Sequence, residues 1–385
     1  MGYLIKKNFV SDEENGYAGS AEIRNLLRLE SDDPEEDAAI LEAINWVEEN
    51  SDCNVKGSKE LIDLYNSIDN EKMDLTLPLS EIEFVGFFHD DEIILNLDGF
   101  NARGIYKFTD SFLDSLFSLK KFGRFCLANG EKDMLNDNIN HLMTTQKDET
   151  RQFRFLMDGE ELFLRGLTTT SYKYYDNNIA IYLALNALHR YSESNGAHIF
   201  VESGYITDSS LDMLFVQEER IKIDEDTFVE VGVRLSNNEI TDGKLAMEFI
   251  YSIFDSKQNQ FRAIGDTVVG IIHTYKVPTI QDKLDNLSHL SKYMEETVQH
   301  ISSIKNRKRL DRDQLSLIFS RLSRAKKNEL SKSSKKSIDH LYREEVIGNT
   351  YSLVELFGKI GSLGTTIEEK LFIQIVFNEL ITEGL

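Results

Sequence analysis

The sequence predicts an α+β fold with a largely antiparallel sheet core, an acidic helical N-terminal region and a helical C-terminal region. Apolar residues recur with a period of two through most of residues 79–276, and short polar turns separate the runs. The flanking residues 1–78 and 277–385 instead carry apolar residues at helical spacing. At 385 residues with 41% hydrophobic content, the chain can fill two or three domain cores, and we place the domain boundaries at these positions.

The N-terminal region is expected to be strongly acidic and helical. Residues 11–50 contain thirteen acids and only two bases. Asp33 is a favourable N-cap residue, Pro34 suits the first helical turn, and the acids that follow lie near the positive end of the helix dipole. A second helix is predicted at 58–68. The buried stripe of the first helix is expected at Ile40, Ile44 and Val47.

The central region is expected to consist mainly of strands. It begins with a predicted β-hairpin whose strands are 81–88 and 92–99, followed by a helix that Thr109 and Asp110 cap. Another helix is predicted at 178–191. Alternating apolar residues and short turns favour antiparallel pairing over parallel βαβ winding. Further strands are expected at 151–158, 161–167, 197–206, 211–217, 228–236, 245–254 and 267–276.

After Pro278 the pattern becomes helical, and a stripe of apolar residues recurs at near-heptad spacing. The stripe is compatible with two structures: a coiled-coil seam that drives self-association, or one amphipathic helix packed on its own core. The polar stretch 328–337 is expected to be a mobile loop or a frayed helix end. Two closing helices are predicted at 351–360 and 366–381. The stripe consists of Leu284, Leu287, Leu290, Met294, Val298, Ile301 and Ile304.

Positive charge is concentrated in one segment of an acidic chain. Residues 303–343 hold thirteen Lys and Arg residues and four acids, whereas the whole chain has a net charge of −23. This basic segment could follow a phosphate backbone, or it could be a solvated helix face that neutralises the acidic body. The residues expected to contact phosphates are Lys305, Arg307, Lys308, Arg309, Arg312, Arg321, Arg324, Lys326 and Lys327.

A second candidate is the string RGLTTTSYKYYDNN at 165–178, which follows a predicted strand and precedes a predicted helix. A guanidinium and tyrosines near a loop can hold a phosphate or stack bases. The alternative is a structural connection in which Asp176 or Asn177 is the N-cap and the tyrosines are partly buried. The candidate binding residues are Arg165, Tyr172, Lys173 and Tyr175. A further polar string at 233–245, between two strands, is explained by turn chemistry.

The sequence contains no motif that predicts catalysis, a metal site or a cofactor. The histidines do not form an HExxH pattern, and neither a glycine-rich phosphate loop nor a GxSxG elbow is present. The two cysteines, Cys53 and Cys126, are not spaced for a metal or for redox chemistry, which favours a reducing cytoplasm. The N-terminus lacks the apolar run of a signal peptide, and no stretch approaches the ~18 apolar residues of a membrane span.

The polar strings give the chain a resemblance to a known family. RGLTTTSYKYYDNN and RLSNNEITDG resemble two motifs of the phage/plasmid-like protein family built on the domain of unknown function 932. In that family the second motif usually has a serine where this chain has Asn238. FTDSFLDSLFSLKKFGRFCLANG and NTYSLVELFGKIGSL are similar to two of its helices. The resemblance covers roughly residues 80–380 and implies a phage or mobile-element source and a cytoplasmic location, but no activity.

Three functional hypotheses follow. The leading one is a non-enzymatic protein that engages nucleic acid, with single strands in replication or recombination as the expected partner; it requires the 165–178 string and the basic segment to share one face. The second is an acidic decoy or adaptor that binds a host DNA-handling or antiphage-defence protein. The third is a metal-dependent enzyme, for which no ligand set can be named. The decoy would use Asp32, Asp33, Glu35, Glu36 and Asp37.

Overall fold

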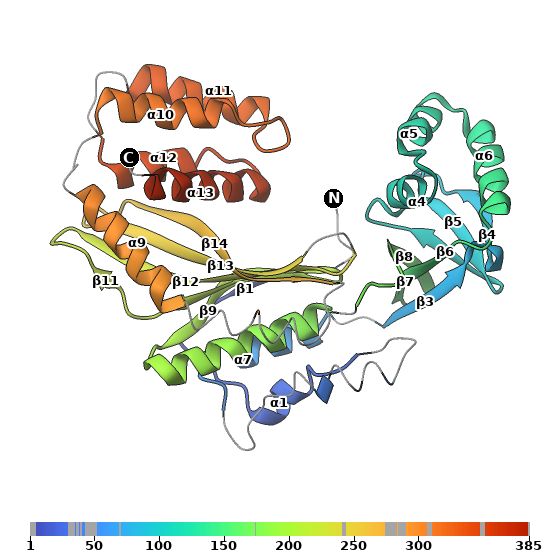
Figure 1. Cartoon of the computed structure of the whole chain (residues 1–385), viewed down its shortest axis with the longest axis horizontal. Helices are drawn as coiled ribbons and strands as arrows, with labels where there is room; N and C mark the ends of the chain where they lie inside the picture. The colour runs from blue at the N-terminus through green and yellow to red at the C-terminus, as the bar shows by residue number, and fades with distance from the viewer. Residues whose placement is uncertain are drawn as a thin grey trace.

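A computed structural model describes most of the chain and shows an α+β protein with two sheets (Figure 1). The first sheet, with α7, lies between the first helices and the C-terminal helices; the second forms a separate lobe with α4, α5 and α6. We call these units the large lobe and the small lobe. The structure describes residues 5–29, 52–68, 71–173, 175–240, 244–273, 290–305, 310–346 and 351–383, together with positions 35, 38, 41, 42 and 283.

The large sheet has the strand order β1-β9-β10-β12-β13-β14, and every neighbour along this path is antiparallel. Alternation places Val229, Val231 and Val233 in the core, and α7 (Asn177–Asn195) contributes a largely apolar surface to the same core. The strands are β1 (Lys6–Val10), β9 (Ile199–Thr207), β10 (Ser210–Gln217), β12 (Thr227–Asn238), β13 (Lys244–Asp255) and β14 (Gln260–Ile272), with the two-residue strands β2 (Val55–Lys56) and β11 (Ile221–Lys222) beside β9 and β12.

The small sheet has the order β3-β7-β8-β6-β5-β4 and a core of its own. The predicted hairpin is confirmed as the antiparallel pair β4 and β5, and β6 pairs with β8 in parallel. The elements are β3 (Lys72–Pro78), β4 (Ile82–Phe87), β5 (Ile93–Leu97), β6 (Phe100–Gly104), α4 (Phe108–Phe117), α5 (Lys120–Asn129), α6 (Lys132–Thr145), β7 (Thr150–Asp158) and β8 (Glu161–Thr168).

The C-terminal helices cover the edge strand β14 of the large sheet. Phe261 of β14 packs edge-on against Phe357 and Phe377, which stack with their ring centroids 4.0 Å apart. In Figure 1, α10 and α11 form an outer layer above α12 and α13. The helices are α9 (Leu290–Lys305), α10 (Arg312–Ser323), α11 (Lys332–His340), α12 (Leu353–Gly361) and α13 (Ile367–Thr382), with a π-helical segment at Leu341–Val346.

The N-terminal region, predicted to be acidic and helical, also contains strands. β1 pairs with β9, β2 pairs with β9 and β3 pairs with β7, so residues 1–78 supply strands to both sheets. The described helices of this region are α1 (Ser20–Arg24) and α3 (Ser58–Asn66). Most of the predicted acidic helix lies outside the described residues.

Two local predictions are also corrected. Thr109 does not cap α4, because its hydroxyl accepts a hydrogen bond from the Ile93 backbone N–H (2.8 Å) and donates one to Glu92 (2.5 Å). The polar stretch 328–337 is not a loop throughout, because α11 begins within it, after Ser331, whose side chain accepts a hydrogen bond from the Ser334 backbone N–H. Of the proposed coiled-coil stripe, the described Ile301 is buried in the chain's own core.

None of the described helices is both long enough and apolar enough to span a bilayer.

Glu369 joins α13 to the start of α11. Its side chain is 5% exposed and accepts hydrogen bonds from the Ser331 backbone N–H (2.7 Å), the Ser334 hydroxyl (2.8 Å) and both the N–H and the hydroxyl of Thr365. Burial alone would raise the pKa of this carboxyl, but these donors outweigh it and hold the pKa well below its usual value.

Glu369→Gln is expected to lower the free energy of unfolding by about 1–3 kcal/mol at pH 7, because charge-assisted hydrogen bonds are lost. The pKa of Glu369 is lower in the folded protein than in the unfolded chain, so its carboxylate stabilises the fold fully above the unfolded pKa of 4.5. This stabilisation is lost as the pH falls through the pKa of the folded protein. Urea titrations at pH 7 and at lower pH should show that the difference in free energy of unfolding between Glu369→Gln and the wild type becomes smaller below about pH 4.5. The control is Glu383→Gln, at an exposed position. A difference in free energy of unfolding between Glu369→Gln and the wild type that does not change with pH would contradict this role for Glu369.

Candidate functional site

The string at 165–178 connects β8 to α7 where the two lobes meet. Arg165 and Tyr175 are each 1% exposed and Tyr172 is 8% exposed. Stacking on a base requires an accessible ring face, and a buried guanidinium cannot reach a phosphate. The burial of Arg165, Tyr172 and Tyr175 therefore counts against the prediction that they bind nucleic acid.

Arg165 belongs to a cluster of six charged side chains that both lobes supply. β3, β7 and β8 of the small sheet provide four of them, and the start of α7 and the residue after β12 provide one each. Three are cations and three are carboxylates, so the charges are balanced. We call this cluster the interlobe latch; it consists of Lys72, Asp74, Arg154, Arg165, Asp176 and Glu239.

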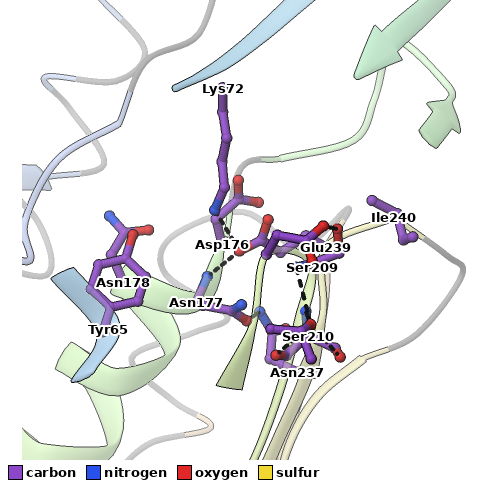
Figure 2. Close-up of polar contacts among 12 residues, drawn as sticks. Tyr65, Lys72, Asp176, Asn177, Asn178, Ser209, Ser210, Asn237, Glu239 and Ile240 are labelled. Atoms are coloured by element: carbon purple, nitrogen blue, oxygen red, sulfur yellow. Dashed lines mark hydrogen bonds and ion pairs between the residues drawn. The ribbon is translucent and has the colours of Figure 1, made fainter. Parts of the chain in front are cut away.

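Glu239 is the centre of the latch. Its carboxylate pairs with Arg165 and with the Lys72 ammonium (3.1 Å), and it accepts a hydrogen bond from the backbone N–H of Asn177 (2.9 Å). Its backbone carbonyl accepts hydrogen bonds from Arg154 and from the Tyr172 hydroxyl (2.9 Å). Figure 2 shows Lys72 and Asn177 reaching Glu239 from different elements. One residue thus receives donors from both lobes.

Arg154 closes the other half of the latch. It donates to the Asp74 carboxylate at 2.8 and 3.0 Å and to both oxygens of Asp176 at 2.7 and 2.9 Å. Burial alone would raise the pKa of Asp176, but Arg154 and Arg165 outweigh burial and hold the pKa well below its usual value. For Lys72, burial alone would lower the pKa, but Glu239 outweighs it and the pKa is raised. Both groups are therefore held in their charged forms.

Tyr172 and Tyr175, the described tyrosines of the string, are packed in the interior. Tyr172 stacks on His273, with ring centroids 4.5 Å apart and an interplanar angle of 7°. Burial raises the pKa of Tyr172 and lowers that of His273, so both rings are neutral. The Lys173 backbone N–H donates to the His273 carbonyl (2.6 Å), which fixes the connection against the end of β14. Of the structural alternative for this string, Tyr172 and Tyr175 are buried, and Asp176 occupies the N-cap position of α7, although its side chain pairs with Arg154 instead of capping the helix.

The carboxylates of the latch are held by ion pairs. Each of its carboxylates is already engaged by cations, and no group of His, Cys, Asp and Glu suited to a metal ion occurs among the described residues. Sequence reasoning missed Lys72, Asp74 and Arg154, and it assigned Glu239 to a polar turn. The sequence did indicate buried ion pairs, because charged residues lie within strongly apolar strands, as in RQFRFLMD.

Part of the basic segment forms an exposed cluster at the α10–α11 connection. Its five members form no ion pair with any described residue, and only Glu329 is an acid within the same stretch. Sequence reasoning identified three of them and omitted the two on α11. We call this cluster the hairpin tip; it consists of Arg324, Lys326, Lys327, Lys332 and Lys336.

The other residues predicted to contact phosphates do not belong to the hairpin tip. Arg312 is exposed at the opposite end of α10, and Arg321 pairs with Glu379 at 2.5 Å. Lys305 ends α9, and its side chain is not described. Arg307, Lys308 and Arg309 lie outside the described residues, as do Asp32, Asp33, Glu36 and Asp37 of the proposed acidic surface. The described Glu35 is exposed.

The described part of the chain also has a groove of about 660 Å³ between the large sheet and the helices α12 and α13. Strand residues Phe200, Phe254 and Arg262 line one side, and Gly358 and Lys370 line the other. Arg262 pairs with Glu202 at 2.7 Å. Volumes of this size accommodate small organic ligands.

Glu239→Gln is expected to destabilise the protein by about 3–5 kcal/mol, because the latch would then hold three cations but only two carboxylates. Urea unfolding followed by circular dichroism measures the loss. The matched control is Glu379→Gln, which breaks an exposed pair with Arg321 and should cost less than about 1 kcal/mol. Equal losses for the two variants would show that the latch does not stabilise the contact between lobes.

No protein-family model, curated protein or solved structure matches this chain, so its function is inferred from the contacts described above.

Proposed function

We propose that this protein binds nucleic acid through phosphate contacts of the hairpin tip. The observation that carries the proposal is the concentration of five exposed cations that form no ion pair within the described part of a chain of net charge −23. Nucleic-acid affinity arises mainly from replacing counterions on phosphates with Lys and Arg side chains. A cation already paired to a carboxylate contributes little to this exchange, so the unpaired ones matter most.

The hairpin tip is held in place by its own contacts. The Lys335 ammonium donates to the Ala325 carbonyl, which joins the end of α10 to α11. Glu369 fixes Ser331 from the other side. A phosphate-binding surface that is ordered before binding loses less conformational entropy on association. The tip therefore presents its lysines from a fixed backbone.

The proposal differs from the sequence-based hypothesis in the residues it uses. Arg165, Tyr172 and Tyr175 are buried, so they do not share an exposed face with the tip. Phosphate contacts alone do not read a base sequence, and binding through the tip should be independent of sequence. A phage or mobile-element source stays a prediction, and no described contact favours the acidic decoy or the metal-dependent enzyme.

The variant Lys326→Glu with Lys327→Glu is expected to weaken binding of labelled single-stranded DNA at least tenfold in fluorescence anisotropy at low salt. It should also reduce the slope of log affinity against log salt by about 1–2, because each lost phosphate contact removes a slope of about 0.7. The change replaces two attractive charges with two repulsive ones.

The matched control is Lys121→Glu with Lys147→Glu, which makes the same charge change at exposed positions of the small lobe. This control should reduce affinity far less than the tip variant. Absence of salt-sensitive binding by the wild-type protein, or equal losses in both variants, would contradict the proposal.

A further inference from the structure

The groove combines a hydrogen-bonding floor with an aromatic wall. Arg262 donates to the Ser252 hydroxyl (2.9 Å) and pairs with Glu202, and Arg220 pairs with Glu230 at 3.3 Å. These pairs hold both guanidinium groups on the sheet side of the groove. The floor is nearly neutral as a result, and it can donate and accept hydrogen bonds.

A planar stacking surface lies beside this floor. The Arg220 guanidinium sits over the Phe254 ring, 4.3 Å from its centroid, and the Arg220 side chain remains 54% exposed. Exposed guanidinium planes and phenylalanine rings are the surfaces on which nucleobases stack. Phe200 adds a second partly buried ring to the lining.

The helical side supplies the uncompensated charge. Lys370, in the first turn of α13, lines the groove, is exposed and forms no ion pair with any described residue. Gln374 and Ser362 lie in the same wall and add hydrogen-bonding groups. A free cation opposite a stacking surface suits a ligand that has an anionic group at one end and a flat ring at the other.

We propose that this groove binds a nucleotide unit, with the base on the Arg220–Phe254 surface and the phosphate at Lys370. Glu202 and Glu230 accept hydrogen bonds from the sugar hydroxyls or from exocyclic amino groups of the base. The assignment uses residues that the hairpin tip does not, so it goes beyond the proposed function and is tested separately from it.

Two kinds of ligand contain such a nucleotide unit: a free mononucleotide and a single-stranded nucleic acid. The second source is suggested by the contact that joins the two surfaces. Glu369, the neighbour of Lys370, accepts a hydrogen bond from the backbone of Ser331, the neighbour of Lys332 in the hairpin tip. A strand that follows the tip could thus continue toward the groove, whose volume excludes a duplex.

The test is a ligand-observed NMR titration with adenosine monophosphate, thymidine monophosphate, adenosine and inorganic phosphate. At least one mononucleotide should bind more tightly than adenosine and phosphate. Phe254→Leu, which removes the ring at similar volume, and Lys370→Gln should each weaken it at least fivefold. Lys121→Gln should leave it unchanged, and thermal melts should show that all variants fold. Mononucleotide affinity that neither groove variant alters would overturn the proposal.

Single-stranded DNA distinguishes the sources and separates this inference from the proposed function. Mononucleotide binding without strand binding would support the groove as a site for free nucleotides and contradict the hairpin-tip proposal. Weaker strand binding by Phe254→Leu, with duplex binding unchanged, would identify the strand as the source. Strand binding that depends on Lys326 and Lys327 but not on Phe254 or Lys370, together with no mononucleotide binding, would overturn the groove alone.

Discussion

The arrangement of the two lobes depends on a balanced group of buried charges. Removing three cations and three carboxylates from water is costly, and the cost is offset only while every member keeps its partners. Because Glu239 belongs to the large lobe and Arg165 to the small lobe, neither lobe can satisfy its own charges alone. The latch therefore specifies one way for the lobes to meet, which a purely apolar contact would specify less strictly.

This constraint also decides which part of the protein faces a partner. The string richest in aromatic and charged residues is used to join the lobes, so the proposed phosphate contacts lie elsewhere. In the proposed function the C-terminal helices take this role, because their apolar side covers β14 while their outer side carries cations. The acidic body and the basic helices thus have separate tasks, which the net charge of the whole chain conceals.

Local patterns predicted the elements well and their partners poorly. Closely spaced apolar residues identified β9, β10, β12 and β13, all of which bury many side chains, and β12 and β13 do so on both faces. Nothing local indicated that β1 pairs with β9 nearly 200 residues away, or that Arg165 meets Glu239 across 74 residues. The exposed lysines of the basic segment were predicted correctly as surface groups, whereas α11 was missed because its serines resemble a loop until Ser331 acts as a cap.

The cover on β14 has a consequence for the solubility of the chain. A Cβ atom at position 358 would lie 2.9 Å from the Gln260 carbonyl oxygen. Glycine, which has no side chain, therefore lets α12 lie this close to the backbone of β14. Any larger residue there would lift the helix from the edge strand. An uncovered strand of this length, rich in Val and Ile, is a template for pairing with a second chain. We therefore expect a larger residue at position 358 to expose β14 to pairing with a second chain.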